Sequence, residues 1–299
     1  MPPGAAGTAA AHADPRTPFV PAASALDLGG RRYDLTHRAL VMGILNRTPD
    51  SFYDKGATFE LDKLWARAEQ LVADGADILD IGGVKAGPGP EVTESEELDR
   101  VVPVVAGLVA RFDTPVSIDT WRASVARACY AEGAVMGNDI SGLADPDYAP
   151  AAAEYGAAVV ITHIRLAPRV ADPDPHYDDV VTDVAAFLTE RAAGARAAGV
   201  PAERIVLDTG LDLGKTAEQS LTLLRASQHL AGLGYPLLLS ASNKTFLGKV
   251  LNLEITERGD ASIGAAALGI SWGCRIVRVH DVVGTCRARD ALAAVSGAQ

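Results

Sequence analysis

Residues 41–52, VMGILNRTPDSF, contain the stretch that decides the fold of this chain. Val41 to Leu45 is an apolar run that is long enough for a buried strand and too short for a helix. The run stops at Asn46, and the residues after it, Arg47-Thr48-Pro49-Asp50-Ser51, are turn formers and polar groups. In a barrel of parallel strands, side chains at the C-terminal end of each strand face the ligand. This stretch therefore predicts a buried strand that ends in ligand-binding groups.

Short apolar runs alternate with helical patterns along the rest of the chain. The predicted strands are 41–45, 78–81, 115–118, 134–137, 157–162, 204–207, 236–239 and 275–279. The predicted helices are 62–73, 94–109, 121–131, 148–155, 178–198, 217–229, 260–272 and 287–295. Eight strand–helix units close into a TIM barrel of about 250 residues, whereas an open dinucleotide-binding sheet would carry GxGxxG after its first strand. We predict the α/β class, with one eight-fold (β/α) barrel domain over residues 26–299.

The amino-acid composition argues against several other classes of protein. Residues 1–25 are rich in Ala and Pro without periodicity, and we predict a disordered tail there. A net charge of −11 argues against a nucleic-acid partner, and no apolar run approaches the length of about 18 residues that spans a membrane. The three cysteines lack CxxC spacing, which argues against a disulfide framework or a zinc site. We expect a cytoplasmic protein.

Polar residues stand at nearly every predicted strand end, which packing alone does not explain. They are Asn46, Asp119, Asn138, Asp139, His163, Asp208, Lys244, Arg278, His280 and Asp281. Asp139 and Asp281 fit a helix N-cap as well as a ligand site, and His163 alone is more often structural. Arg278 and His280 alternate along the last strand and should share its inner face, where a cation needs an anionic partner or an anionic ligand.

These residue types suit a planar polar heterocycle that carries an anionic group. Two buried carboxylates and an amide can bind the donor–acceptor edge of a pterin-like ring. Lys244, Arg278 and His280 can hold phosphate oxygens, and Asn46 can join a phosphate-bound Mg²⁺. The segment 210–216, GLDLGKT, has the wrong spacing for a phosphate loop.

Taken together, the motifs resemble the dihydropteroate synthase family. They are MGILNRTPDSF (42–52), ADILDIGG (76–83), SIDT (117–120), NDISG (138–142), DTGLDLGKT (208–216), SNKTFLG (242–248) and RVHDV (278–282). The resemblance implies a barrel that forms a homodimer and condenses a dihydropterin pyrophosphate with p-aminobenzoate, which sulfonamides mimic. It also implies that Asp119, Asn138, Asp208 and Lys244 hold the pterin, that Arg278 and His280 hold the pyrophosphate, and that Asn46 binds magnesium. The implied catalytic set is Asp119, Asp208, Lys244, Arg278 and His280.

The chain departs from the family pattern in its outer loops. After DIGG the family usually has Glu-Ser-Thr-Arg-Pro-Gly, and the Thr and Arg of that loop are here Ala86 and Gly87. Asn243 replaces a usual Arg, and Leu213 replaces a usual aromatic residue. Arg47 replaces a small residue, and it is either a solvated turn residue or a compensating charge. The pattern is similar to a divergent second paralogue of actinobacteria.

Three functions fit these departures. The first is a pterin-binding paralogue with weak or absent synthase activity, which the altered loops favour. The second is a fully active dihydropteroate synthase. The third is a pterin-dependent methyltransferase of the same fold, which the RVHDV and NRTPDS segments fit less well.

Overall fold

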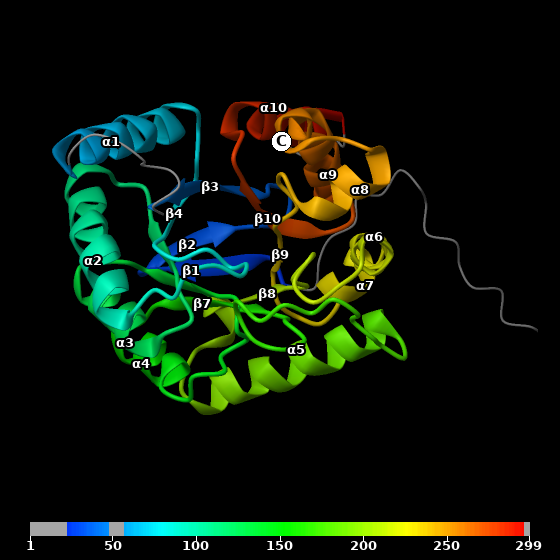
Figure 1. Cartoon of the computed structure of the whole chain (residues 1–299), viewed down its shortest axis with the longest axis horizontal. Helices are drawn as coiled ribbons and strands as arrows, with labels where there is room; N and C mark the ends of the chain where they lie inside the picture. Colours follow the sequence, from blue (N-terminus) through cyan, green and yellow to red (C-terminus); the bar gives the residue numbers. More distant parts are fainter. Residues whose placement is uncertain (1–22, 48–56, 296–299) are drawn as a thin grey trace, which may run out of the picture.

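A closed barrel of eight parallel strands forms the centre of the molecule (Figure 1). The computed structural model describes residues 23–47 and 57–295. In barrel order the strands are β10 (Cys274–Val279), β3 (Leu40–Asn46), β4 (Ile78–Gly82), β5 (Val116–Asp119), β6 (Met136–Asp139), β7 (Ala158–Thr162), β8 (Ile205–Asp208) and β9 (Leu237–Leu239). The predicted TIM barrel is confirmed.

A ring of helices surrounds the barrel (Figure 1). They are α1 (Ala57–Ala73), α2 (Glu94–Arg111), α3 (Ala123–Ala131), α4 (Tyr148–Tyr155), α5 (Val180–Ala197), α6 (Ala217–Arg225), α7 (Ser227–Ala231), α8 (Thr245–Leu251), α9 (Gly259–Ser271) and α10 (Val282–Val295). Side chains on the outer face of the strands, such as Val41, Ile118 and Val277, pack against these helices in one continuous core. The inner face of the strands makes a second core.

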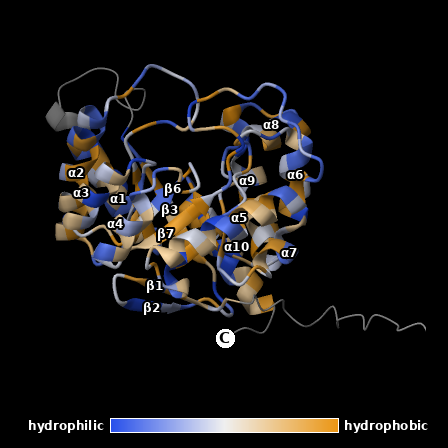
Figure 2. Cartoon of the chain, turned by 90° about the horizontal axis from the view of Figure 1, so that it is seen from below, coloured by the Kyte–Doolittle hydropathy of each residue, from blue (hydrophilic) through white to orange (hydrophobic). Residues whose placement is uncertain are grey.

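An antiparallel hairpin closes one end of the barrel, and the sequence analysis did not predict it. Strands β1 (Ala25–Leu28) and β2 (Arg31–Asp34) pair across a Gly29-Gly30 turn. Leu26 and Leu28 are buried and belong to the inner core with Met42, Met136 and Ile276. Figure 2 shows this hairpin at one end of the barrel and the long connecting loops at the other. The hairpin thus covers the end at which the strands begin, and the ends of the strands that carry the predicted site residues lie at the loop end.

Several predicted boundaries were wrong. The predicted helix 217–229 is two helices, α6 and α7, with a break at Ala226, and α8 was not predicted. Helix α10 begins at Val282 instead of residue 287, because Asp281 accepts a hydrogen bond from the Gly284 N–H at 2.9 Å and caps the first turn. Most of the predicted tail, residues 1–22, and the predicted turn 48–52 lie outside the described residues. Within the described part of the chain, no helix has the length and apolarity needed to cross a membrane.

Candidate functional site

Strand register aligns the predicted site residues on β3, β5 and β6 with one another. Asn46 on β3 is opposite Gly82 on β4, Gly82 is opposite Asp119 on β5, and Asp119 is opposite Asn138 on β6. Further round, Thr162 on β7 is opposite Asp208 on β8. The side chains of Asp119, Asn138 and Asp208 belong to the last two residues of their strands, so the predicted convergence at the mouth is correct.

A network of charged groups lies inside the barrel just below these strand ends. The Arg278 guanidinium donates from Nε to Asp80 Oδ2 at 2.6 Å and from Nη2 to Asp119 Oδ2 at 2.8 Å. Asn138 donates to the same Asp80 oxygen at 3.2 Å. Burial raises the pKa of the Asp119 carboxyl above its ordinary value, and the charge of Arg278 opposes that rise. Of the two alternatives predicted for Arg278, an anionic partner or an anionic ligand, the structure shows partners, Asp80 and Asp119.

Sequence reasoning missed Asp80. It is fully buried and lies on β4 within the segment ADILDIGG, where it was treated as part of an apolar strand. A carboxylate inside such a run is the available signal, because a buried charge needs a partner. Its partner lies 198 residues further along the chain.

Three buried polar atoms around this network have no hydrogen-bond partner among the described residues. They are Asp80 Oδ1, Ser117 Oγ and Thr162 Oγ1, on β4, β5 and β7. Ser117 is opposite Asp80 in the strand register. Buried polar atoms in folded proteins are nearly always paired, so these three atoms are exceptions of the kind that occurs at functional sites.

Asp208 and Lys244 form the opposite side of the pocket. Asp208 Oδ1 accepts from the Gly210 N–H at 2.8 Å, and Lys244 Nζ donates to the Leu211 carbonyl at 2.8 Å. Burial raises the pKa of Asp208 and lowers that of Lys244, and each charge opposes the shift of the other. Gly210 has φ +64°, and an added Cβ would lie 1.9 Å from the His163 carbonyl oxygen, so only glycine fits this turn.

His163 and Lys215 form a buried structural pair behind the site. Lys215 Nζ lies 2.9 Å from His163 Nδ1 and also donates to the carbonyls of Gly210 and Leu213, at 2.9 Å and 3.0 Å. Burial and the Lys215 charge lower the pKa of His163 to about 3, so the imidazole is neutral and can accept this bond. The structural interpretation of His163 is supported. Lys215 belongs to the GLDLGKT segment, which does not match a phosphate loop, and it stabilises the turn between β8 and α6.

The remaining strand-end residues have separate roles. His280 follows the end of β10 and is exposed at the rim, with Nδ1 2.9 Å from Ser242 Oγ, so it does not share the buried position of Arg278. Asp139 accepts from the N–H groups of Ser141 and Leu143, at 2.6 Å and 2.8 Å. It therefore organises the turn after β6 and does not cap a helix.

Asn46 is the one residue predicted to bind a metal. Its side chain is exposed at the mouth and can offer a single amide oxygen. No cluster of three or more His, Cys, Asp or Glu residues that could hold a metal is present in residues 23–47 and 57–295. A hard cation at this position would thus take most of its oxygen ligands from a phosphate group and water, as Mg²⁺ often does.

Comparisons with known proteins agree with this arrangement. Residues 42–280 match the family described as pterin binding enzyme. The chain is 43% identical over 266 residues to inactive dihydropteroate synthase 2 of Mycobacterium leprae, covering 87% of this chain and 91% of the relative. It is 42% identical over 247 residues to dihydropteroate synthase of Bacillus subtilis, covering 82% and 84% of the two chains.

A solved structure of similar fold is that of Xanthomonas albilineans dihydropteroate synthase in complex with 7,8-dihydropteroate. Its TM-score is 0.82 at 39% identity, and the match covers 91% of this chain and 98% of that one. The fold, the polar layer inside the barrel mouth and these relatives agree: the chain belongs to the dihydropteroate synthase family of pterin-binding enzymes.

Proposed function

We propose that the barrel mouth binds a dihydropterin through the polar layer of Asp80, Asp119, Asn138 and Asp208. The observation that carries this proposal is the position of Asp119, Asn138 and Asp208 at the C-terminal ends of β5, β6 and β8, beside the Arg278 network. A pterin ring presents N–H donors and a carbonyl acceptor on one edge, which suits carboxylate and amide partners at the bottom of an apolar barrel. Lys244 adds a donor on the far side.

The reaction that fits this site transfers a pterin methylene group from oxygen to nitrogen. The C–O bond to pyrophosphate breaks, the amine of p-aminobenzoate forms a C–N bond, and the amine loses a proton. Asn46 and His280 stand at the rim where the pyrophosphate would lie, and Arg278 adds positive charge below them. A Mg²⁺ ion held by Asn46 and the phosphates would supply further charge neutralisation. The protein's contribution is positioning and electrostatic stabilisation without a covalent intermediate.

We propose that synthase activity is weak or absent, although the pterin pocket is complete. The loop between β4 and α2 has Ala86 and Gly87 where family members have Thr and Arg. Lys85 could restore a charge, but as a point charge two positions away it would not reproduce the fork of an Arg side chain. Loss of one charge-assisted hydrogen bond costs about 1.5–3 kcal/mol, or roughly ten- to hundredfold in rate. The alternative is a fully active synthase, as the Bacillus subtilis relative is named.

Two measurements on the purified protein test this function. Calorimetry with a pterin analogue should detect binding, and no binding at millimolar concentration would refute the pterin site. An assay of pyrophosphate release should give a rate far below ~1 s⁻¹, and turnover in the ordinary enzyme range would favour the active alternative. Rescue of a synthase-deficient bacterium would give the same answer in cells, and competition with a sulfonamide would test the acceptor side.

We also propose a cytoplasmic homodimer. Exposed apolar side chains occur on α8, on the short helix 255–257 and on α9: Val250, Leu251, Ile255 and Leu268, with Ile255 63% exposed. Exposed apolar side chains that form a patch often mark protein contacts. Trp272 and Leu292, which the sequence suggested as contact residues, are half-buried and pack against the core. Light scattering of the Leu268→Glu variant should report a monomer if α9 lies in the contact.

A further inference from the structure

The β4–α2 loop, residues 83–93, is held by arginines that donate to its carbonyl oxygens. Arg100 on α2 donates to Gly83 O at 2.8 Å, and Arg122, just before α3, donates to Val92 O at 2.8 Å. Arg169, from the β7–α5 loop, donates to Pro90 O and, at 3.4 Å, to Lys85 O. The loop's own middle segment, Ala-Gly-Pro-Gly-Pro (86–90), carries no polar side chain that could fix it.

Arg169 makes contacts that bind its loop to the β4–α2 loop. Its backbone N–H donates to Ala86 O at 3.0 Å, in addition to the two side-chain bonds. Its φ of +66° is left-handed, a conformation that costs a non-glycine residue about 1 kcal/mol or more and persists where tertiary contacts demand it. The β7–α5 loop is itself braced by the bidentate Arg165–Asp172 ion pair, at 2.5 Å and 2.6 Å.

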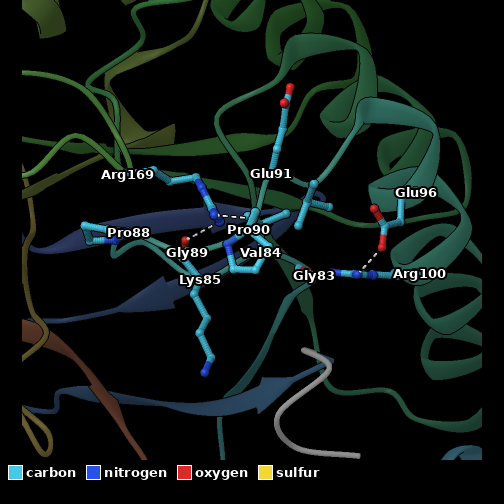
Figure 3. A pocket seen from close by; sticks show the side chains of 11 residues that line it. Gly83, Val84, Lys85, Pro88, Gly89, Pro90, Glu91, Glu96, Arg100 and Arg169 are labelled. Carbon is cyan, nitrogen blue, oxygen red and sulfur yellow. Dashed lines mark hydrogen bonds and ion pairs between the residues drawn. The ribbon is translucent and has the colours of Figure 1, made fainter.

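A cavity of about 310 Å³ lies between these groups. Figure 3 shows Arg169 on one side of it, meeting the loop at Pro90, and Arg100 on the other, paired with Glu96. Lys85 and Glu91 extend from the loop in opposite directions. Arg169 is bonded to carbonyl oxygens only, and no carboxylate pairs with it among the described residues. It is thus a cation that acts on the loop backbone.

We propose that Arg169 is a positioning residue that holds the β4–α2 loop as a fixed wall on the acceptor side of the site. It acts through the loop backbone and does not touch the pterin pocket, which is formed by the strand ends. The proposal rests on the proposed function in one respect: the aromatic amine acceptor enters beside this loop. The bracing of the loop itself is independent of any activity.

The test replaces Arg169 with Asn, a residue that tolerates the left-handed backbone. We expect the backbone amide of residue 169, which donates to Ala86 O at 3.0 Å, to exchange about tenfold faster or more, because loss of the side-chain bonds lets the two loops separate. The dissociation constant of a pterin analogue should stay within about twofold, whereas that of p-aminobenzoate, measured with pyrophosphate and the analogue present, should rise about fivefold. Arg169→Lys keeps the charge without the planar fork and should recover only part of the protection.

Arg196→Ala is the matched control, because it removes one exposed cation from α5 without reaching either loop. It should leave loop exchange and both affinities unchanged. Unchanged exchange of the residue 169 amide in Arg169→Asn would overturn the proposal, as would an equal loss of pterin and acceptor affinity. If the wild-type chain binds no acceptor, the acceptor part of the proposed function fails, while the exchange measurement still decides the role of Arg169.

Discussion

The inner polar layer of the barrel and the β4–α2 loop lie next to each other and are stabilised in opposite ways. In the inner layer, charged side chains hold one another: Arg278 binds Asp80 and Asp119, both from other strands. In the loop, side chains contribute little and arginines from elsewhere hold backbone carbonyls. A pocket built from paired side chains can stay formed when the loops around it change. The β4–α2 loop has lost the Thr and Arg of the family pattern, and its Lys85 lies two positions away from the missing Arg. This difference explains how pterin binding and synthase activity can separate.

The largest effect should come from removing the cation of the inner layer. Arg278→Met leaves Asp80, fully buried, and Asp119, 17% exposed at its side chain, without their partner. Urea unfolding should show a loss of about 3 kcal/mol in the free energy of unfolding, together with loss of pterin binding.

The control for that experiment is Arg225→Met on α6. Arg225 pairs with Glu218 at 3.4 Å, but the two side chains are 62% and 77% exposed. Such a surface pair should change stability by less than about 1 kcal/mol. Similar losses in the two variants would mean that the inner ion pairs are not specially important for the fold.

A second effect depends on pH. Burial lowers the pKa of Lys215 to about 7, so the folded lysine loses its proton above pH 7 while the unfolded lysine keeps it until its ordinary range near 10.5. The unfolded state then binds more protons, and the free energy of unfolding should rise between pH 7 and pH 10. In Lys215→Met this rise should be smaller by on the order of 2 kcal/mol.

Lys249→Met, an exposed position on α8, serves as the control for the pH series. It should keep the wild-type slope, so that the comparison isolates the buried amine from the other groups that titrate in alkali. Parallel curves for Lys215→Met and the wild type would show that Lys215 is charged in the folded protein at pH 8.

A smaller effect should follow from restoring the family's side chains in the outer loop. An added Cβ at Gly87 would meet no atom within 4 Å, and Ala86 is exposed, so Ala86→Thr with Gly87→Arg should fold normally. We expect the rate of residual pyrophosphate release to increase about tenfold, because one charge-assisted hydrogen bond to the transition state lowers the barrier by about that factor. Gly194→Arg adds the same charge at an equally open position on α5 and should have no effect. An unchanged rate in the double variant would place the defect elsewhere, with Asn243 and Leu213 as the next candidates.

Sequence predicted the barrel and most of the pocket because both depend on local patterns. Each strand is an apolar run with a polar residue at its end, and parallel register then collects residues such as Asp119 and Asp208 at one rim. The hairpin β1–β2 was not predicted because its two four-residue strands give almost no apolar pattern: β1 has two buried side chains and β2 has none. The roles of Asp80 and Arg169 were not predicted because their partners are distant in the chain and only the closed fold brings them together.

The smallest effect concerns Arg47, which the sequence left as either a solvated turn residue or a compensating charge. The side chain is half-buried, and its Nη1 donates to the Arg100 carbonyl on α2, while the backbone N–H donates to Gly82 O at 2.8 Å. A guanidinium already directed at α2 has to give up that bond to reach a pyrophosphate at Asn46.

We therefore expect Arg47→Ala to weaken binding of a pterin pyrophosphate by less than about threefold, or ~0.6 kcal/mol, in calorimetry. Arg47→Lys, which retains the charge, separates lost packing from lost charge. If Arg47→Ala lost tenfold or more and the lysine variant did not, Arg47 would belong to the anion site after all. The outer loops would then retain part of the positive charge that is lost at Gly87. The inner layer would remain complete, and the outer loops would be deficient only in the groups that bind the acceptor.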